Sequence, residues 1–453
     1  MMEGVGLNQK LYRRIQASSF LSFTMDAYSL LLIGSLGAFA LKVLLPPNFP
    51  AIYDTVLTYL TLGITVLFRP VGAMIFGNRS DKFGRKGVMI ITVIGYSITM
   101  LLTAIVPSYA VAGYVGLILF FGFRMAQGIF VGGDPTGSHP MALETTKSGK
   151  RGIISGFIQS GFSVGSVSAA LVLLATTTYF HVPFLYTTGW RIAAAVGIIP
   201  AFIALYIRLR IPESPMFNIA KEKAQLLKNP LKTLFTKYWR IFIPAIITTI
   251  GMDWIFYSTQ GFYATYLYTV VHFSPKLGAI ILVYAGIAEV VGTFIGGPLA
   301  GRIGRRKFIA LIGVIIAIIS YPLYFYAESG SYISVLLFTT VLGGVGQMYW
   351  GAMPIFLGER YPTNVRGVGI AFSWHFAFFI DSWIGLIIPL FAFKFFSGTI
   401  AGYALTSSLF VIIGAIIMII GVVLSISDNK NMKLPEEVQG IKEGVIPATG
   451  EVE

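Results

Sequence analysis

The chain contains no cysteine and only four histidines in its 453 residues. The absence of cysteine excludes disulfide bonds and thiolate-bound metals. Charged residues are scarce as well: they make up 11% of the chain, whereas about 25% is usual in soluble domains. Acidic residues number only 19, and hydrophobic residues reach 55%. This composition excludes an ordinary soluble protein.

The motifs of common enzyme classes are missing too. The sequence has no Gly-rich phosphate loop, no His-Glu-x-x-His helix and no nucleophile elbow. Its histidines, His139, His181, His272 and His375, are too widely spaced to indicate a metal site. We therefore expect a protein that is not an enzyme, that holds no metal or cofactor and that does not use ATP.

Long apolar runs are abundant instead. Twelve of them recur from one end of the chain to the other, and each is close to the roughly 20 residues that an α-helix needs to cross a bilayer. They are too long and too continuous for barrel strands of about ten alternating residues. The sequence therefore predicts an all-α membrane protein with twelve transmembrane helices.

The formal net charge of +14 is unevenly distributed. Most of the 33 Lys and Arg residues lie before the first apolar run, in the segments after even-numbered runs and in the C-terminal tail. This is the positive-inside pattern, so we expect a lipid bilayer as a partner and no nucleic acid. The pattern predicts that both termini are cytoplasmic. Residues 1–18 carry a basic flank without a cleavage site, so no removable signal peptide is expected.

Two loop motifs occur twice in the chain. GNRSDKFGRK (77–86) and GPLAGRIGRR (297–306) share two glycines and an arginine at matching positions. ETTKSGKRG (144–152) and ERYPTNVRG (359–367) share a glutamate, an arginine seven residues later and a glycine. The repetition of both motifs indicates an internally duplicated bundle of six plus six helices.

The duplication divides the chain into five parts. We expect a cytoplasmic N-terminus (1–18), an N-terminal six-helix bundle (19–208), a cytoplasmic linker with short surface helices (209–239), a C-terminal six-helix bundle (240–426) and a cytoplasmic tail (427–453). The two bundles would be related by pseudo-symmetry.

The motifs resemble those of a known family. GNRSDKFGRK resembles the signature loop of the major facilitator superfamily, and FRPVG at 68–72 is similar to its metabolite:proton symporters. RMAQG at 124–128 and PESPMF at 212–217 resemble the sugar-porter pattern. GGD at 132–134, with DAY at 26–28, is similar to the phosphate:proton symporters. The resemblance implies the twelve-helix major facilitator fold and transport by alternating access.

The repeated loops carry charges that, by this resemblance, form a gate between the halves. Asp81 and Arg85 are four residues apart, close enough to pair across one helical turn. Gly301 stands in place of Asp81 in the second copy, so the latch would be asymmetric. The alternative is ordinary anchoring or salt bridging at the membrane surface. The predicted gating residues are Asp81, Arg85, Glu144, Arg151, Arg305, Glu359 and Arg366.

Five carboxylates and one arginine fall inside the apolar runs. A lone charge at the bilayer centre costs at least about 2.5 kcal/mol. One arginine cannot neutralise five carboxylates, so some should be protonated or face a water-filled cavity, which is the chemistry of proton coupling. These residues are Asp26, Arg124, Asp134, Asp253, Glu289 and Asp381. The sequence leaves the roles of Glu289 and Asp381 open.

The resemblance implies roles for three of the six. Asp26 matches the helix-one carboxylate that binds and releases the proton in sugar porters and phosphate symporters. Arg124 matches the helix-four Arg of sugar porters and would be the partner of Asp26. Asp134 occupies the place of the Asp in the GGD motif. We therefore predict proton coupling through these three residues, with static interhelical hydrogen bonds as the alternative.

Candidate substrate contacts combine amides, aromatic rings and charged groups. Gln159 stands seven residues after Gly152, the spacing at which sugar porters carry a substrate-binding Gln. The others lie on the seventh, tenth and eleventh predicted helices, where they could line a cavity or pack within the bundle. The predicted substrate-binding residues are Gln159, Asp253, Trp254, Gln260, Tyr349, Trp350, Trp374 and His375.

Departures from the family patterns narrow the substrate class. Pro135 follows the GGD motif where phosphate symporters have Tyr, and Ser258 and Phe262 stand where their seventh helix has Asp and Tyr. Phosphate is therefore disfavoured. Thr259 precedes Gln260, so the tandem Gln of sugar porters is missing. A small organic acid fits the FRPVG resemblance, and a sugar stays open.

The predicted function is proton-coupled symport of a small polar metabolite, an organic acid or a sugar, across the cell membrane by alternating access. The alternatives are an uncoupled facilitator or an exporter of the same fold, and a membrane sensor. A sensor would need a larger output domain than the tail at 427–453. The expected partners are the small-molecule substrate, protons and the lipid bilayer, and the protein is expected to act as a monomer.

Overall fold

The computed structural model describes residues 9–47, 57, 60, 61, 63–179, 184–223 and 225–425. Within these residues all regular secondary structure is helical. Ten of their segments are long and apolar enough to cross a membrane. The helix α1 (Gln9–Leu44) and the helical stretch that ends in α3 (Arg69–Phe83) complete the twelve transmembrane helices. The predicted all-α fold is confirmed.

The N-terminal half continues from α3 through four more membrane crossings. Two of these crossings are interrupted: α6 and α7 meet at Asp134, which is followed by a proline, and α10 and α11 meet at Gly197. A proline lacks the backbone N–H of a continuous helix, so the break at α7 is expected. The elements are α4 (Arg85–Ala104), α5 (Tyr109–Ala112), α6 (Tyr114–Gly133), α7 (Pro135–Glu144), η1 (Ser148–Lys150), α8 (Arg151–Tyr179), η2 (Leu185–Gly189), α10 (Trp190–Val196) and α11 (Ile198–Leu209).

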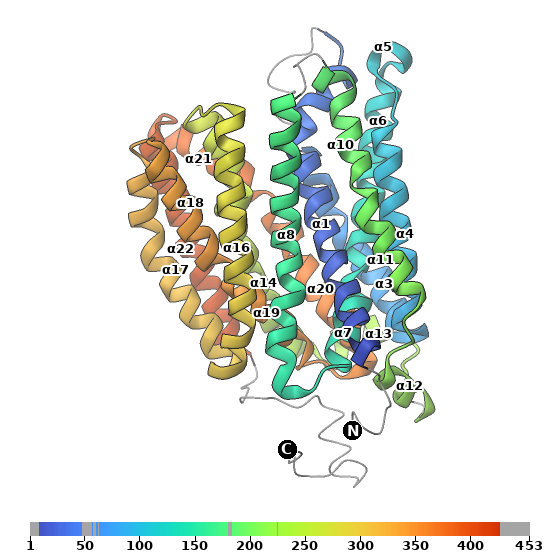
Figure 1. Cartoon of the computed structure of the whole chain (residues 1–453). Coiled ribbons are helices and arrows are strands. Elements are labelled where there is room, and N and C mark those ends of the chain that lie inside the picture. Colours follow the sequence, from blue (N-terminus) through green and yellow to red (C-terminus); the bar gives the residue numbers. More distant parts are fainter. Residues whose placement is uncertain are drawn as a thin grey trace.

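The C-terminal half repeats this arrangement. Its interrupted crossings are α14 with α15 and η3, α18 with α19, and α20 with α21. The elements are α14 (Trp239–Ser258), α15 (Gln260–Thr265), η3 (Tyr266–Val270), α16 (Pro275–Ile303), α17 (Arg305–Ala327), α18 (Tyr332–Gly346), α19 (Met348–Gly358), α20 (Thr363–Asp381), α21 (Ile384–Phe396) and α22 (Ile400–Leu424). Figure 1 shows the two halves side by side, with α8 and α16 adjacent between them.

The repeated loop motif has a backbone explanation. Gly84 joins α3 to α4 with a φ of 118°, and Gly304 joins α16 to α17 with a φ of 106°. Side chains with a Cβ rarely adopt this conformation, whereas glycine does so without strain. The shared glycine is therefore what lets each loop reverse direction within one residue.

The helix α1 begins at Gln9, inside the stretch 1–18 that the sequence assigned to the N-terminus. Ile15 and Gln16 are buried, and Gln16 Nε2 donates to Thr146 Oγ1 at 3.2 Å. This stretch therefore packs against the segment that follows α7. Residues 1–8, the tail at 427–453 and His181 lie outside the described residues.

The linker between the halves forms two short helices, α12 (Pro215–Glu222) and α13 (Pro230–Lys237). Each has a proline at its start and a capping side chain before it: Ser214 accepts from the Phe217 N–H, and Asn229 from the Lys232 N–H. Such caps stabilise a helix N-terminus. The helix α13 packs on both α3 and α20, so the linker bridges the halves.

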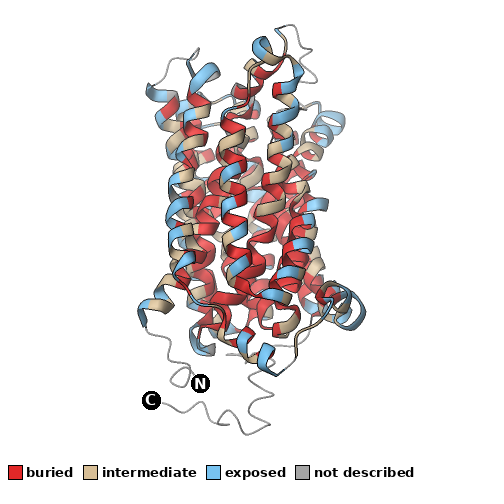
Figure 2. Cartoon of the chain, turned by 90° about the vertical axis from the view of Figure 1, so that its right-hand side faces the viewer, coloured by how far each residue is buried: buried red, intermediate tan, exposed pale blue. Residues whose placement is uncertain are grey.

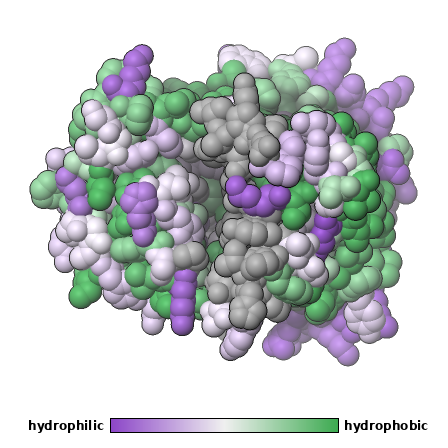
Figure 3. Space-filling model, turned by 90° about the horizontal axis from the view of Figure 1, so that it is seen from above, coloured by the Kyte–Doolittle hydropathy of each residue, from purple (hydrophilic) through white to green (hydrophobic). Residues whose placement is uncertain are grey.

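The halves meet most extensively along two helix pairs, α8 with α16 and α3 with α20, and α8 with α19 and α7 with α20 also pack across the junction. Glycines bring α8 and α16 into backbone contact: a Cβ on Gly156 would lie 2.6 Å from the Phe294 carbonyl oxygen, and one on Gly297 would lie 2.5 Å from the Gly156 nitrogen. Small residues allow this close approach in membranes. Buried residues concentrate inside the bundle (Figure 2), and the end-on view shows hydrophobic residues along parts of its rim (Figure 3).

Candidate functional site

Charged side chains gather at the end of the bundle that carries the repeated loops, which we call the basic end. Glu144 of α7 lies at the centre of the first cluster. Its Oε1 accepts from Arg366 of α20 at 2.7 Å and from Arg85 of α4 at 3.3 Å. Glu144 therefore binds one arginine from its own half and one from the other half.

The second cluster mirrors the first. Glu359, which follows α19, pairs with Arg305 of its own half at 2.8 Å and with Arg151 of the N-terminal half at 4.0 Å. Burial raises the pKa of Glu359 above its ordinary value, and the neighbouring Arg305 opposes this shift. The two copies of the repeated motifs thus form two related ion clusters, each of which crosses the junction of the halves.

Asp81 adds a contact that only the first cluster has. Its two carboxylate oxygens accept from the backbone N–H groups of Gly367 and Val368 at 3.0 and 2.8 Å, and Oδ1 also accepts from Arg85 at 2.6 Å. The Arg85 Nη2 donates to the Thr363 carbonyl at 2.7 Å. These bonds join α3 and α4 to α20. Gly301, the counterpart of Asp81, provides no such side chain.

The linker takes part in the first cluster, which the sequence analysis did not foresee. Glu213 accepts from the backbone N–H groups of Arg85 and Lys86 at 2.9 and 3.2 Å, at the start of α4. Ser214 donates to Glu144. Both residues lie in the PESPMF motif, and this motif was the sequence feature from which their participation in the cluster could have been predicted.

Asp26 lies in the middle of α1 and forms a bidentate ion pair with Arg69 of α3. Arg69 Nη2 and Nη1 donate to its two oxygens at 2.5 and 3.0 Å. The predicted partner, Arg124, is wrong for this structure: it donates to the Thr61 carbonyl and, at 2.7 Å, to Gln127. Arg124 faces the segment before α3, whereas Arg69 at the start of α3 faces α1. Arg69 belongs to the FRPVG motif, and this motif could have pointed to Arg69 as the partner of Asp26.

Asp134 pairs with Arg208 of α11 at 2.7 Å and accepts from Thr92 of α4 at 3.0 Å. Arg208 also donates to Ser18 and Ser22 of α1. Every one of these partners belongs to the N-terminal half. The contacts therefore need not change when the halves move relative to each other, which favours the static alternative for Asp134.

A small cavity of about 20 Å³ lies between the halves. Three of the predicted substrate residues, Gln159, Trp350 and Trp374, line it. The sequence analysis did not predict the three phenylalanines or Gln347 in its wall. Nothing in the sequence distinguishes these three from the other phenylalanines among the 36 in the chain. The full lining is Gln159, Phe162, Phe256, Gln347, Trp350, Trp374 and Phe378.

The cavity adjoins the ion pair of Asp26. The guanidinium of Arg69 lies 5.3 Å from the centre of the Phe378 ring, and Phe378 is part of the cavity wall. A ligand in the cavity would thus be separated from a buried cation by a single aromatic ring. This position suits coupling between ligand binding and the Asp26–Arg69 pair.

The other predicted substrate residues lie around the cavity without lining it. Tyr349 donates to the Met252 carbonyl at 2.9 Å, His375 stacks on Trp374 at 5.3 Å, and Trp254 packs on Phe410 at 5.9 Å. Asp253 is fully buried.

A second cavity of about 70 Å³ lies between α1, α8 and the helices α14 to α16. It contains Gln260, a predicted substrate residue, together with Glu289. Phe256 belongs to the walls of both cavities. The second cavity is therefore a neighbour of the first, with the Phe256 ring in the wall of each.

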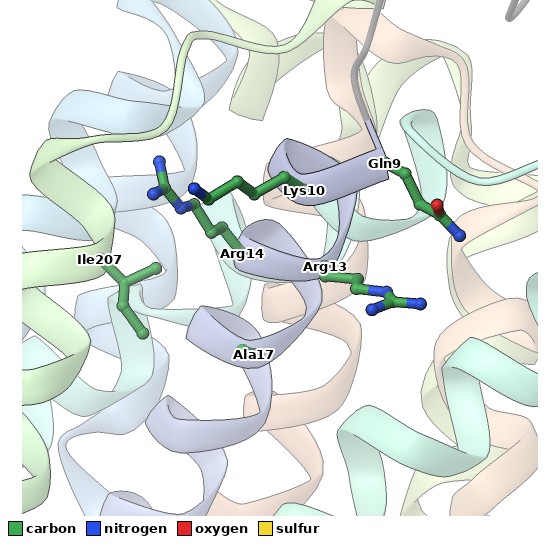
Figure 4. Close-up of a pocket in the computed structure, with 6 residues that line it drawn as sticks. All are labelled: Gln9, Lys10, Arg13, Arg14, Ala17 and Ile207. Atoms are coloured by element: carbon green, nitrogen blue, oxygen red, sulfur yellow. The ribbon is translucent and has the colours of Figure 1, made fainter.

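A further hollow lies on the surface of the basic end, where α1 begins beside the end of α11 (Figure 4). Figure 4 shows Lys10 and Arg14 on the side of Ile207, with Arg13 and Gln9 on the other. It contains no predicted site residue, and its basic side chains belong to the positive layer expected at a membrane surface. Among the described residues, no group of three or more His, Asp or Glu side chains could hold a metal ion.

Comparisons with known proteins agree on one family. The model of the Major Facilitator Superfamily matches residues 27–380. A putative metabolite transport protein of Haemophilus influenzae is 29% identical over 341 residues, which are 73% of this chain and 76% of that protein. A proline/betaine transporter of Escherichia coli is 29% identical over 373 residues, which are 80% of this chain and 74% of that protein.

Solved structures show the same fold. The proton:xylose symporter XylE aligns with a TM-score of 0.73 at 18% identity, covering 91% of this chain and 96% of XylE. At this identity the likeness concerns the fold alone.

Proposed function

Because the chain belongs to the major facilitator superfamily of transporters, we propose that it is a proton-driven symporter of a small carboxylate-bearing metabolite. It would work by alternating access as a monomer in the cytoplasmic membrane, with both termini in the cytoplasm. The observation that carries the proposal is the Asp26–Arg69 pair, in which Arg69 is buried and Asp26 is largely buried, next to an aromatic cavity between the halves.

The ion clusters at the basic end support alternating access. Asp81, Glu144 and Glu359 each bind groups of the opposite half. These bonds hold the basic end closed, and they must break for the cavity to open there. Rocking of two pseudo-symmetric halves around a central site is the general behaviour of such folds.

Competition for Arg69 would couple the proton to the substrate. Arg69 presents both of its terminal nitrogens to Asp26, and a bidentate arginine matches a carboxylate. A substrate carboxylate that draws Arg69 away leaves Asp26 uncompensated in the membrane, where an isolated carboxylate binds a proton. Substrate binding and protonation of Asp26 would then favour each other, as linkage requires.

The aromatic wall supports a zwitterionic substrate within this class. Five of the seven residues that line the cavity are Phe or Trp, and aromatic faces attract alkylated ammonium groups. The proline/betaine transporter among the relatives has a name that fits such a molecule. We therefore propose a small amino-acid or betaine-like zwitterion ahead of a simple organic acid.

A sugar is the second candidate. Gln159 and Gln347 place two amides in the cavity wall, and amides can bind hydroxyl groups. A sugar carries no carboxylate to compete for Arg69, so it offers no comparable route to proton coupling. An uncoupled facilitator or an exporter would retain the same fold.

The test uses purified protein in liposomes that contain a trapped pH dye. Proline, glycine betaine, lactate and xylose are added outside one at a time, and solute uptake and internal pH are recorded together. The variants are Asp26→Asn and a control, Glu222→Gln, which removes an exposed carboxylate on α12.

We expect one zwitterion to acidify the interior with the wild type and with Glu222→Gln. Asp26→Asn should lose uphill uptake and acidification while it still exchanges substrate across the membrane. Uptake without a pH change in the wild type would contradict proton coupling and indicate a facilitator. Acidification driven by xylose alone would contradict the carboxylate-bearing substrate.

A further inference from the structure

The C-terminal half contains a carboxylate at mid-membrane that the proposed mechanism does not use. Glu289 is the middle residue of the membrane-crossing helix α16, and only 4% of its surface is exposed. In the part of the chain that the structure describes, its side chain forms no hydrogen bond and no ion pair. An ionisable side chain at this depth is costly and is usually retained for binding or transport, so Glu289 requires an explanation.

Glu289 lines the second cavity, together with Gln260 and Tyr263 of α15. The cavity measures about 70 Å³, which is several times the roughly 10–15 Å³ that one water molecule needs. Much of the remaining wall consists of alanine and glycine, whose small side chains leave this space open. The carboxylate therefore faces a space that can hold a small polar group of a ligand.

The polar groups of this wall converge beside Gly343 of α18. A Cβ on Gly343 would lie 3.6 Å from Glu289 Oε1 and 3.7 Å from the Tyr263 hydroxyl oxygen. The Tyr263 hydroxyl is buried and has no hydrogen-bond partner among the described residues, although buried polar atoms normally have one. Gln260 Nε2 donates to the Gly343 carbonyl at 3.4 Å. Two oxygens from different helices thus approach one point without bonding to each other.

The charge of this wall favours a cation. None of the described residues that line the second cavity is Lys, Arg or His, whereas Glu289 is acidic. The hydroxyl of Tyr263 and the carboxylate of Glu289 can both accept hydrogen bonds. The rings of Phe256 and Tyr263 also belong to the wall, and aromatic faces attract cations. The complementary ligand is a cation with N–H groups.

We propose that Glu289, Tyr263 and Gln260 form a binding site for a primary or secondary ammonium group. Glu289 supplies the opposite charge, and its Oε1 and the Tyr263 hydroxyl accept the N–H groups. A quaternary ammonium has no N–H to donate, so it would satisfy only the charge. A Ca²⁺ ion would need six to eight oxygen ligands, more than this wall offers. The assignment of the site to the ammonium end of a transported zwitterion rests on the proposed function, whereas ammonium binding itself does not.

The site lies farther from the basic end than the first cavity does. The helix α8 begins at the basic end with Arg151; Gln159 and Phe162 line the first cavity, and Ser166 and Leu173, further along the helix, line the second. The ion clusters close the basic end on the far side of the first cavity. The ammonium site is therefore on the side of the first cavity that these clusters do not close.

Saturation-transfer NMR titrations of the purified protein in lipid nanodiscs test the site without transport. One ligand is pyrrolidine, which is a cation at neutral pH and corresponds to proline without its carboxylate. The other is tetrahydrofuran, in which an uncharged oxygen replaces the nitrogen. We expect the pyrrolidinium ion to bind the wild type and the control Glu222→Gln, and tetrahydrofuran to bind neither. Glu289→Gln should weaken pyrrolidinium binding by about tenfold or more, because removing one partner of a buried charge pair is costly.

Two milder variants leave the carboxylate in place. Tyr263→Phe removes a hydroxyl that has no partner among the described residues, so it breaks no internal hydrogen bond. It should weaken pyrrolidinium binding by about fivefold, the effect of one hydrogen bond. Gly343→Ala adds a methyl group beside the two oxygens with its nearest neighbour at 3.5 Å, an ordinary contact, and it should also weaken binding. Gly122→Ala is the matched control, because a Cβ there has nothing within 4 Å.

Unchanged pyrrolidinium affinity in Glu289→Gln would overturn the site. If that variant does not fold, unchanged affinity in both Tyr263→Phe and Gly343→Ala would overturn it instead. Tetramethylammonium that binds as tightly as pyrrolidinium would contradict the requirement for N–H groups. Failure of every zwitterion to acidify the liposomes would overturn the proposed function but would leave the pyrrolidinium result standing. The two hypotheses can therefore fail separately.

Discussion

At the scale of single residues, the partner of each buried charge determines what that charge can do. Asp26 and Asp134 are both carboxylates inside the N-terminal half. Asp26 pairs with Arg69, which reaches the wall of the cavity between the halves. Asp134 pairs with Arg208, which is tied to α1 and α4 of its own half. The first pair fits the proposed coupling, whereas the second joins helices within one half.

Replacing Arg69 by Lys keeps the charge but loses the bidentate geometry. A charge-assisted hydrogen bond contributes about 1.5–3 kcal/mol, so we expect uphill uptake to fall by about tenfold or more. Arg79→Lys is the matched control, because Arg79 lies exposed on the same helix. Initial uptake rates into liposomes whose external buffer is more acidic than their interior provide the measurement. Equal rates for the two variants would show that bidentate pairing is not needed.

Asp134→Asn should destabilise the protein rather than uncouple it. The change leaves Arg208 buried without its carboxylate, and such a loss costs about 3–5 kcal/mol. The melting temperature of the purified variant should therefore fall clearly below that of Glu222→Gln. An unchanged melting temperature together with lost proton coupling would restore the role that the sequence analysis predicted for Asp134.

At the scale of helices, the two contacts between the halves use different chemistry. The helices α8 and α16 meet through glycines, whose backbones touch directly. The helices α3 and α20 meet through Asp81, which accepts two backbone N–H groups of α20. The first contact is mainly close backbone packing, with one side-chain hydrogen bond between Ser163 and Thr293 at 3.2 Å, whereas the second contact contains several charge-assisted hydrogen bonds that must be broken. We therefore expect α3 and α20 to control the opening of the basic end.

Asp81→Ala should increase the fraction of molecules that are open at the basic end. Leu143 reports this, because its side chain packs against Gly358 of the opposite half and is 2% exposed. In the cysteine-free chain, Leu143→Cys provides one labelling site. Loss of charge-assisted bonds worth about 1.5–3 kcal/mol should raise the maleimide labelling rate by about tenfold. An unchanged rate would remove Asp81 from the latch.

At the scale of the whole molecule, two ion clusters close the same junction. Glu144 binds Arg366 of the other half, and Glu359 binds Arg151 of the other half. Among the ion pairs of the described residues, Glu144 pairs with Arg85 and Arg366, and Glu359 pairs with Arg305 and Arg151. If the halves rock as rigid bodies, both clusters are intact in one state and broken in the other. Their contributions to the closed state should then add.

Glu144→Gln and Glu359→Gln, each combined with Leu143→Cys, test this addition. Each variant should raise the labelling rate, and the double variant should raise it by the product of the two factors, because free energies of independent contacts add. A double variant that labels no faster than the faster single variant would mean that one cluster alone holds the junction closed.

The sequence by itself determined the class of the molecule. The length and number of apolar runs dictate a helical membrane protein because a bilayer leaves no other way to satisfy backbone groups. The repeated loops identified the duplicated architecture. The sequence also singled out Arg85, Glu144, Arg305 and Glu359, which the structure joins in ion pairs, because the same motifs carry them twice. Such motifs can be recognised without the structure because all of their residues lie within a few positions of one another in the chain.

Only the tertiary structure decided which charges meet. Arg69 and Arg124 lie on helices that both approach α1 in a bundle, and a rotation of one helix selects which arginine reaches Asp26. The cavity wall likewise combines residues from α8, α14, α19 and α20, which are far apart in sequence. Pairing of this kind depends on the rotation and depth of packed helices, and apolar periodicity does not specify either of them to within one side chain.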